Sequence, residues 1–167
     1  MSLELLSLEE NIANLREQLA GLRGTLTTAP EEEETRLKQK IRKLKQKIGE
    51  FEKEYWQLVS QVLPTWSIND ADAELVKGEI IEGVDRLSVL PPSELQTEML
   101  ELLRGIRDQL DAPGTTAAAK LKGTISSFPP FVSLAYEAEL DTEQFLKTHF
   151  PTFRGWVARL VARNAKK

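Results

Sequence analysis

Residues 5–26 and 37–62 of the chain, LLSLEENIANLREQLAGLRGTL and LKQKIRKLKQKIGEFEKEYWQLVSQV, place apolar side chains at alternating steps of three and four residues. That spacing puts these side chains on one narrow stripe of an α-helix, as in a coiled coil. The stripe residues, which we call the seam, are Leu5, Leu8, Ile12, Leu15, Leu19, Leu22, Leu26, Leu37, Ile41, Leu44, Ile48, Phe51, Tyr55, Leu58 and Val62. The pattern therefore predicts two long amphipathic helices.

A short connection, Thr27-Thr28-Ala29-Pro30, links the two helices. Thr28 and Glu31 have the spacing of a helix-capping box, and Pro30 is tolerated in a first helical turn. Because so short a link brings the second helix back beside the first, residues 1–63 are predicted to form an antiparallel coiled-coil arm. A two-helix hairpin rarely buries both stripes alone, so we expect later helices or a second chain to cover it, and favour a homodimer.

The rest of the chain, residues 64–167, is predicted to form a small α+β body. Helical periodicity covers residues 71–87 and continues from Ser93 to about residue 110. A short helix should open at Asp141 and stop near Pro151, which cannot continue it. The last predicted helix mixes apolar residues with arginine and lysine, which makes it basic and amphipathic.

Residues 119–140 alternate in polarity about Pro129-Pro130. If the chain reverses at the prolines, Lys120 faces Glu139 and Lys122 faces Glu137, so opposite charges meet across two strands. The other face of this pair is mostly apolar. The segment therefore predicts a β-hairpin, and the predicted fold class is mainly α with one β-hairpin.

The composition excludes several kinds of site. The chain has no cysteine and only one histidine, His149, so metal sites built from several His or Cys ligands are excluded. No Gly-x-Gly-x-x-Gly or Gly-x-x-x-x-Gly-Lys-Ser/Thr loop is present to hold phosphates. We therefore predict a protein that is not an enzyme, with no metal, no cofactor and a structural role for His149.

The formal charge of −4 is unevenly distributed. Residues 1–62 carry 10 basic and 11 acidic side chains, residues 63–111 carry 4 and 11, and residues 112–167 carry 8 and 4. The acidic middle and the basic end can attract each other within or between chains, or the basic end can meet an anionic surface. Seven basic residues lie within 36–47, but the preceding glutamates and the overall acidity argue against nucleic acid as a partner.

A resemblance covers residues 91–167. The runs KLKGTISSFPPF (120–131), YEAELDTE (136–143) and FPTF (150–153) resemble a C-terminal module of cyanobacterial multidomain proteins linked to conflict systems and cell death. That module has no known catalytic residues. The resemblance implies an accessory role in a bacterial defence or cell-death system, linked to an effector or a membrane.

Two hypotheses for function follow from these patterns. In the first, the chain is a non-enzymatic adaptor that oligomerises through the seam and docks an unknown protein partner. In the second, it is a membrane-active effector that uses the hairpin and the basic last helix. For either surface the candidate residues are Phe128, Phe131, Trp156, Arg159 and Arg163. With no leader pattern and no spanning run of about 18 apolar residues, we expect a cytoplasmic protein, with peripheral membrane association as the alternative.

Overall fold

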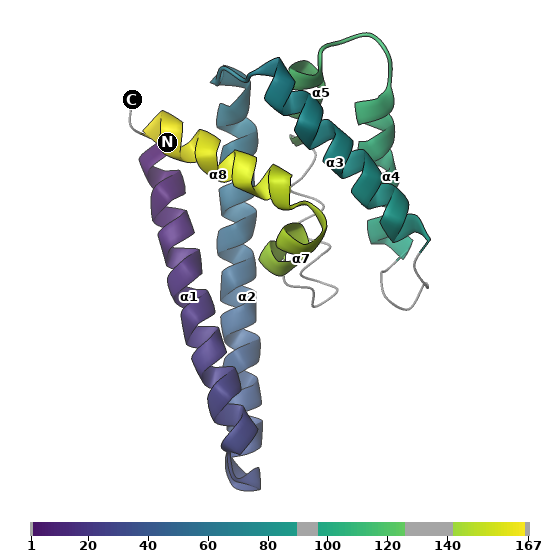
Figure 1. The fold of residues 1–167 in the computed structure, drawn as a ribbon. Coiled ribbons are helices and arrows are strands. Elements are labelled where there is room, and N and C mark those ends of the chain that lie inside the picture. The colour runs from purple at the N-terminus through teal and green to yellow at the C-terminus, as the bar shows by residue number, and fades with distance from the viewer. Residues whose placement is uncertain (1, 90–96, 126–141, 166–167) are drawn as a thin grey trace.

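The computed structural model describes residues 2–89, 97–125 and 142–165, and within them every regular element is helical (Figure 1). These elements are α1 (Ser2–Thr28), α2 (Glu31–Val62), the short 3-10 helix η1 (Leu63–Thr65), α3 (Asp70–Ser88), α4 (Thr97–Asp111), α5 (Ala117–Ile125), α7 (Thr142–His149) and α8 (Pro151–Ala165). The prediction of a mainly helical chain is confirmed for this part of the protein.

Helices α1 and α2 form the predicted long hairpin. They contain 27 and 32 residues, which corresponds to lengths of about 40 and 48 Å. The predicted cap at Thr28 is wrong, because α1 continues through Thr28 and its hydroxyl donates to the Thr25 carbonyl of the same helix. Pro30 takes the N-cap position of α2 and makes no side-chain cap hydrogen bond.

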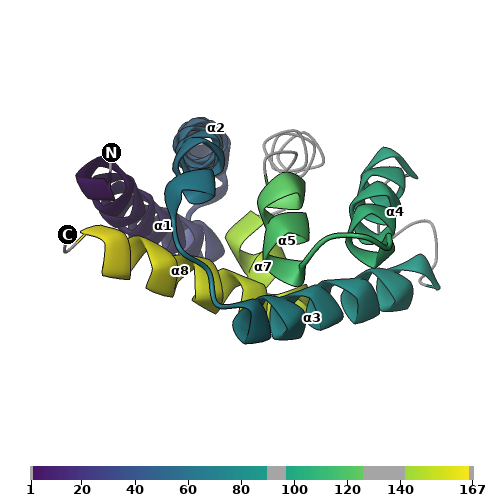
Figure 2. The ribbon, with the colours of Figure 1, turned by 90° about the horizontal axis from the view of Figure 1, so that it is seen from above.

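The helices lie in two layers, which are clear from above (Figure 2). Helices α8 and α3 follow each other across one layer, while α1, α2, α5 and α4 lie side by side in the other. Helix α8 contacts α1, and α3 contacts α4 and α5. The last helix of the chain therefore packs back against the first.

A single hydrophobic core joins the arm to the body across the predicted boundary at residue 63. The indole of Trp56 in α2 stacks on the Phe153 ring of α8, with centroids 5.8 Å apart and ring planes 14° from parallel. The seam residues Leu5, Leu8 and Ile12 belong to this core. A second, smaller cluster inside the arm consists of Leu15, Leu19, Ile41 and Ile48.

Two carboxylates of α3 cap the starts of other helices. The Glu79 carboxylate accepts hydrogen bonds from the backbone N–H groups of Thr152 and Phe153, both at 2.8 Å, in the first turn of α8. The Asp70 carboxylate accepts one from the Ala118 N–H of α5 at 3.1 Å. Because the first N–H groups of a helix lack intrahelical partners and attract negative charge, these contacts hold α5 and α8 against α3.

The predicted β-hairpin over 119–140 is not seen. Residues 119–125 of the predicted hairpin are helical, because Ala117–Ile125 forms α5, and its residues 126–140 lie outside the described part of the chain. The alanine run at 117–119 favours a helix, and the Thr116 hydroxyl accepts a hydrogen bond from the Ala119 N–H. The buried residues of this helix, Ala117, Leu121, Thr124 and Ile125, follow a helical period. The alternating polarity from Lys120 onward had predicted a strand instead.

The other predicted helices are confirmed with small changes. Helix α3 covers the predicted 71–87, and the break between α7 and α8 falls at Phe150 and Pro151 as expected. Helix α4 ends close to the predicted position, while its predicted start at Ser93 lies outside the described residues.

Gly83 in α3 marks a close approach between this helix and the α7–α8 junction. A Cβ at this position would lie 2.5 Å from Cε1 of Phe150 and 3.2 Å from the His149 carbonyl oxygen. Phe150 is itself buried, so its ring has little room to move. Gly78, in the same helix, has open space where a Cβ would be added.

We predict opposite effects of alanine at these two glycines. Gly83→Ala should lower the free energy of unfolding by about 1–3 kcal/mol, because the methyl group overpacks the contact with Phe150. Gly78→Ala should raise it by about 0.5–1 kcal/mol, because alanine favours the helix. Urea denaturation of the two variants measures both changes, and a Gly83→Ala protein as stable as the wild type would contradict the close approach.

Candidate functional site

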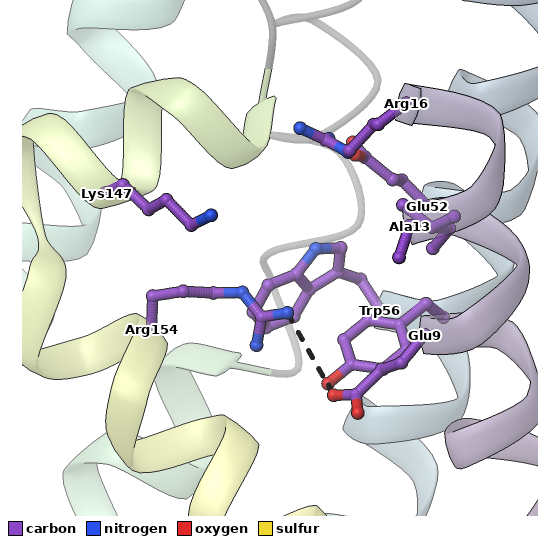
Figure 3. Close-up of a pocket in the computed structure, with 9 residues that line it drawn as sticks. Glu9, Ala13, Arg16, Glu52, Trp56, Lys147 and Arg154 are labelled. Atoms are coloured by element: carbon purple, nitrogen blue, oxygen red, sulfur yellow. Dashed lines mark hydrogen bonds and ion pairs between the residues drawn. The ribbon is translucent and has the colours of Figure 1, made fainter. Parts of the chain in front are cut away.

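A cavity of about 140 Å³ lies between the arm and the α7–α8 pair (Figure 3). Helices α1 and α2 form one wall, and Lys147 of α7 and Arg154 of α8 project from the other side. The lining residues are Glu9, Ile12, Ala13, Arg16, Glu52, Tyr55, Trp56, Lys147 and Arg154. Five of these nine side chains are charged, so the cavity differs in character from the apolar core beside it.

Arg16 and Glu52 form an ion pair that links α1 to α2 inside the cavity. The Glu52 side chain is only 4% exposed, whereas that of Arg16 is 21% exposed. Glu52 uses Oε1 for Arg16, and its buried Oε2 accepts no hydrogen bond within the described part of the chain. A buried carboxylate oxygen without a hydrogen bond in the described part of the chain therefore lies beside the cavity.

Glu9, Tyr55 and Arg154 form a second polar group. The Tyr55 hydroxyl donates a hydrogen bond to Glu9 Oε1 at 2.6 Å, and Arg154 Nη2 lies 4.0 Å from the same oxygen. The Arg154 guanidinium carbon lies 5.7 Å from the centre of the Tyr55 ring, within the range of a cation–π contact. Burial raises the pKa of Tyr55 well above its ordinary value of 10.0, so the phenol stays a neutral donor.

None of the charged lining residues was predicted as a site from the sequence. A signal was present for three of them, because Glu9, Arg16 and Glu52 each directly follow a seam residue and so flank the interface between the two helices. Lys147 and Arg154 carry no comparable signal. They reach the cavity only because α7 and α8 fold back onto the arm.

The predicted partner-surface residues have different positions in the structure. Phe128 and Phe131 lie outside the described residues. Trp156 is 3% exposed, so the expectation of a surface position for it is wrong: the apolar face of α8 is used by the core. Arg159 and Arg163 are exposed, and Arg163 donates a hydrogen bond to the Ser67 carbonyl.

The seam residues lie mostly between α1 and α2 or under α8. Ten of the fifteen are buried: Leu5, Leu8, Ile12, Leu15, Leu19, Leu37, Ile41, Ile48, Tyr55 and Val62. The other five are half-buried: Leu22, Leu26, Leu44, Phe51 and Leu58. Leu22, Leu26 and Leu44 belong to the half of the arm that is farther from the body.

Residues 2–89, 97–125 and 142–165 contain no group of three or more His, Cys, Asp or Glu side chains placed to hold a metal ion. None of the described helices has both the length and the apolar character needed to cross a membrane.

Comparisons with family models, with curated proteins and with solved structures found no match to this chain. The resemblance of residues 91–167 to the cyanobacterial module therefore stays a prediction.

We predict an unequal response to breaking the Arg16–Glu52 pair. Arg16→Met should lower the free energy of unfolding by about 3–5 kcal/mol, because it leaves the Glu52 carboxylate buried without its cation. Glu52→Gln should lower it less, because the more exposed Arg16 can be hydrated. Urea denaturation compares the two variants, with Lys38→Met at the exposed Glu34–Lys38 pair as a control expected within about 0.5 kcal/mol of wild type. Equal losses at Arg16 and Glu52 would contradict the difference in burial.

His149 generates a prediction about pH. Burial, and secondarily the charge of Arg86, lower its pKa below the ordinary value of 6.5. Since the unfolded chain then binds the proton more readily, the stability that neutral His149 contributes is present above pH 6.5 and is lost as the pH falls through its lower folded-state pKa. The melting temperature should therefore fall less between neutral and mildly acidic pH in His149→Gln than in the wild type. Identical falls in both proteins would be inconsistent with this assignment.

Proposed function

We propose that the chain is a non-enzymatic oligomerisation and docking module, an adaptor whose α1–α2 arm is the assembly element. The observation that carries this proposal is the projection of the arm. Its far half, around the α1–α2 turn, extends beyond the other described helices (Figure 1). Among the described residues, only the packing of α1 on α2 closes this half, whereas α8 covers the near half.

The apolar residues of the far half support a further packing partner. Four buried residues form its cluster, and Leu22, Leu26 and Leu44 around them are only partly buried. Most of the stability of a helix in a protein comes from tertiary packing of its apolar face, and two helices alone supply little of it. A second pair of helices against this face would complete a four-helix arrangement.

The charge distribution of the arm supports a second copy of the chain as that partner. Residues 36–47 hold seven basic side chains and no acidic one, while Glu31–Glu34 hold four acidic ones in the first turn of α2. Suppose that the α2 helices of two copies pack antiparallel, with residues 38–39 of both at the centre of the contact. The glutamates of each copy then lie opposite residues 43–46 of the other. The same patch then serves both copies, as in a twofold dimer.

The structure removes two observations that favoured the membrane-active alternative. Residues 120–125 of the proposed inserting hairpin are helical, and the apolar side chains of α8 lie in the core instead of facing outward. Arg159 remains exposed, but without an apolar face beside it the helix lacks the amphipathic surface that lipid binding requires.

We predict that reversing either set of charges separates the dimer and that mixing the two variants restores it. One variant changes Glu31, Glu32, Glu33 and Glu34 to Lys, and the other changes Lys43, Lys45 and Lys47 to Glu. Each alone should be monomeric in light scattering after size exclusion at about 50 μM protein and low salt, because like charges meet across the interface. The mixture should form a heterodimer, because opposite charges meet again.

A matched control reverses three exposed carboxylates of the body, at Asp72, Glu82 and Glu101, and should leave the dimer unchanged. Circular dichroism checks that every variant remains helical. A wild-type chain that is monomeric under these conditions would contradict the proposal. If such a monomer also sedimented with anionic vesicles, the membrane-associated alternative would be favoured instead.

A further inference from the structure

We propose that the outer side of α2 docks an acidic amphipathic helix of a partner protein. The docking surface combines a row of cationic side chains, which we call the basic ridge, with a line of half-buried apolar side chains beside it. The basic ridge consists of Arg36, Lys40, Lys43 and Lys47. The apolar line consists of Leu44, Phe51 and Leu58.

The members of the basic ridge lie on one line along α2. They follow one another at steps of four, three and four residues, and residues at these steps are neighbours on a helix surface. The ridge is about 16 Å long, because each residue of an α-helix advances about 1.5 Å. All of its side chains are exposed. The ridge therefore presents a regular row of positive charge to solvent.

The positive charge of the ridge is not neutralised inside the chain. Among the basic residues at 36–47, only Lys38, which is not part of the ridge, is in an ion pair within the described residues, and its partner is Glu34. Each ridge residue instead has another cation three or four residues away, and like charges at that spacing destabilise a helix. A row of carboxylates opposite the ridge would replace this repulsion by attraction.

The ridge faces away from the body of the protein. Trp56 marks the side of α2 that meets the body, because its ring stacks on Phe153 of α8. Lys47 precedes Trp56 by nine residues, which is about two and a half helical turns and places it on the opposite side of α2. A partner can therefore reach the ridge without displacing α8.

The apolar line gives the partner a second kind of contact. Leu44, Phe51 and Leu58 recur every seven residues and are each only partly buried, whereas most residues of the seam are buried. Leu44 lies four residues after Lys40 and three before Lys47, so it borders the ridge directly. Half-exposed apolar side chains beside a row of charge suit an amphipathic helix, which brings both kinds of side chain on one face.

The surroundings of the ridge favour an acidic helix over nucleic acid. Carboxylates border the ridge at both ends, with Glu31–Glu34 before it and Glu50 and Glu54 after it, so a much longer anion would meet repulsion there. No aromatic residue occurs within 36–47, so unpaired bases would have no ring to stack on. A helix advances by the same distance per residue as α2, so carboxylates at steps of four, three and four residues match the ridge charge by charge.

This docking surface overlaps the contact that we propose between two copies of the chain. In that contact the glutamates of a second copy lie opposite residues 43–46, which belong partly to the ridge. The acidic helix and the second copy should therefore exclude each other, so that a bound partner helix separates the dimer. This competition rests on the proposed dimer, but the docking of the helix does not.

Fluorescence anisotropy with a labelled acidic peptide tests the docking on the full chain. The probe is an alanine-based helical peptide of about 22 residues, or about six turns, with four glutamates at steps of four, three and four residues and leucines along one edge of them. At about 0.1 M salt, where charges more than about 10 Å apart are largely screened, it should bind with a dissociation constant below about 1 mM.

Two comparisons decide what the surface recognises. A peptide of the same composition with its glutamates spread around the helix should bind at least about fivefold more weakly, because it cannot place all of them opposite the ridge. A short oligothymidylate should also bind more weakly than the probe. The docking is overturned if both peptides bind equally, if neither binds, or if the oligothymidylate binds more tightly than the probe.

Two double variants that lose the same charge locate the site. Arg36→Gln with Lys40→Gln removes half of the ridge and should weaken binding of the probe by about fivefold or more, because two ion pairs are lost. Lys38→Gln with Arg42→Gln removes an arginine and a lysine from the other side of the same helix and should leave the affinity within about twofold of wild type. Equal affinities of the two double variants would overturn the assignment.

Light scattering after size exclusion, with and without the probe, tests the competition. A saturating amount of the probe should lower the mass of the wild type from two chains to one chain with one peptide. A probe that binds the dimer without lowering its mass would overturn the competition. A wild-type chain that is monomeric without the probe contradicts the proposed dimer alone, and the anisotropy titration still decides the docking.

Discussion

The packing of Trp56 on Phe153 is the contact on which the arrangement of this protein depends. It stacks the C-terminal part of the second helix on the start of the last one and so ties the arm to the body. Because α8 is held there, it covers the near half of the seam and leaves the far half projecting. The same contact places Arg154, the next residue after Phe153, over Tyr55 and against Glu9. A single aromatic contact thus determines both the exposed part of the arm and one wall of the cavity.

The two halves of the arm consequently have different physical characters. In the near half, charged side chains are drawn into a confined space, where Arg16 and Glu52 pair and Tyr55 stays protonated. In the far half, the charges of residues 36–47 remain in water and repel each other. In the near half the charges are therefore paired inside the chain, whereas the far half presents its charges to solvent.

The β-hairpin prediction shows where local reasoning failed. Alternating polarity from Lys120 onward fits a strand, but the preceding alanines and the Thr116 cap already favour a helix that continues through Ile125. A short apolar pattern fits both the helical period and the strand period. Which of the two forms depends on which side chains pack against a core. Here Leu121 and Ile125 meet the core beneath α3 and α4, which selects the helix. The same limit applies to Trp156, whose arginine neighbours suggested a surface but whose side chain is buried.

The sequence by itself determined the helical hairpin, the helix over residues 71–87 and the break at Pro151, because each follows from local periodicity or from a proline. It also placed Glu9, Arg16 and Glu52 beside the seam, where they face the paired helix. Only the tertiary structure decided that Lys147 and Arg154 join them, that Glu79 and Asp70 cap distant helices, and that Trp156 is buried. The caps connect residues 48 or more positions apart. The energies of these contacts arise from packing and charge pairing that no local pattern records.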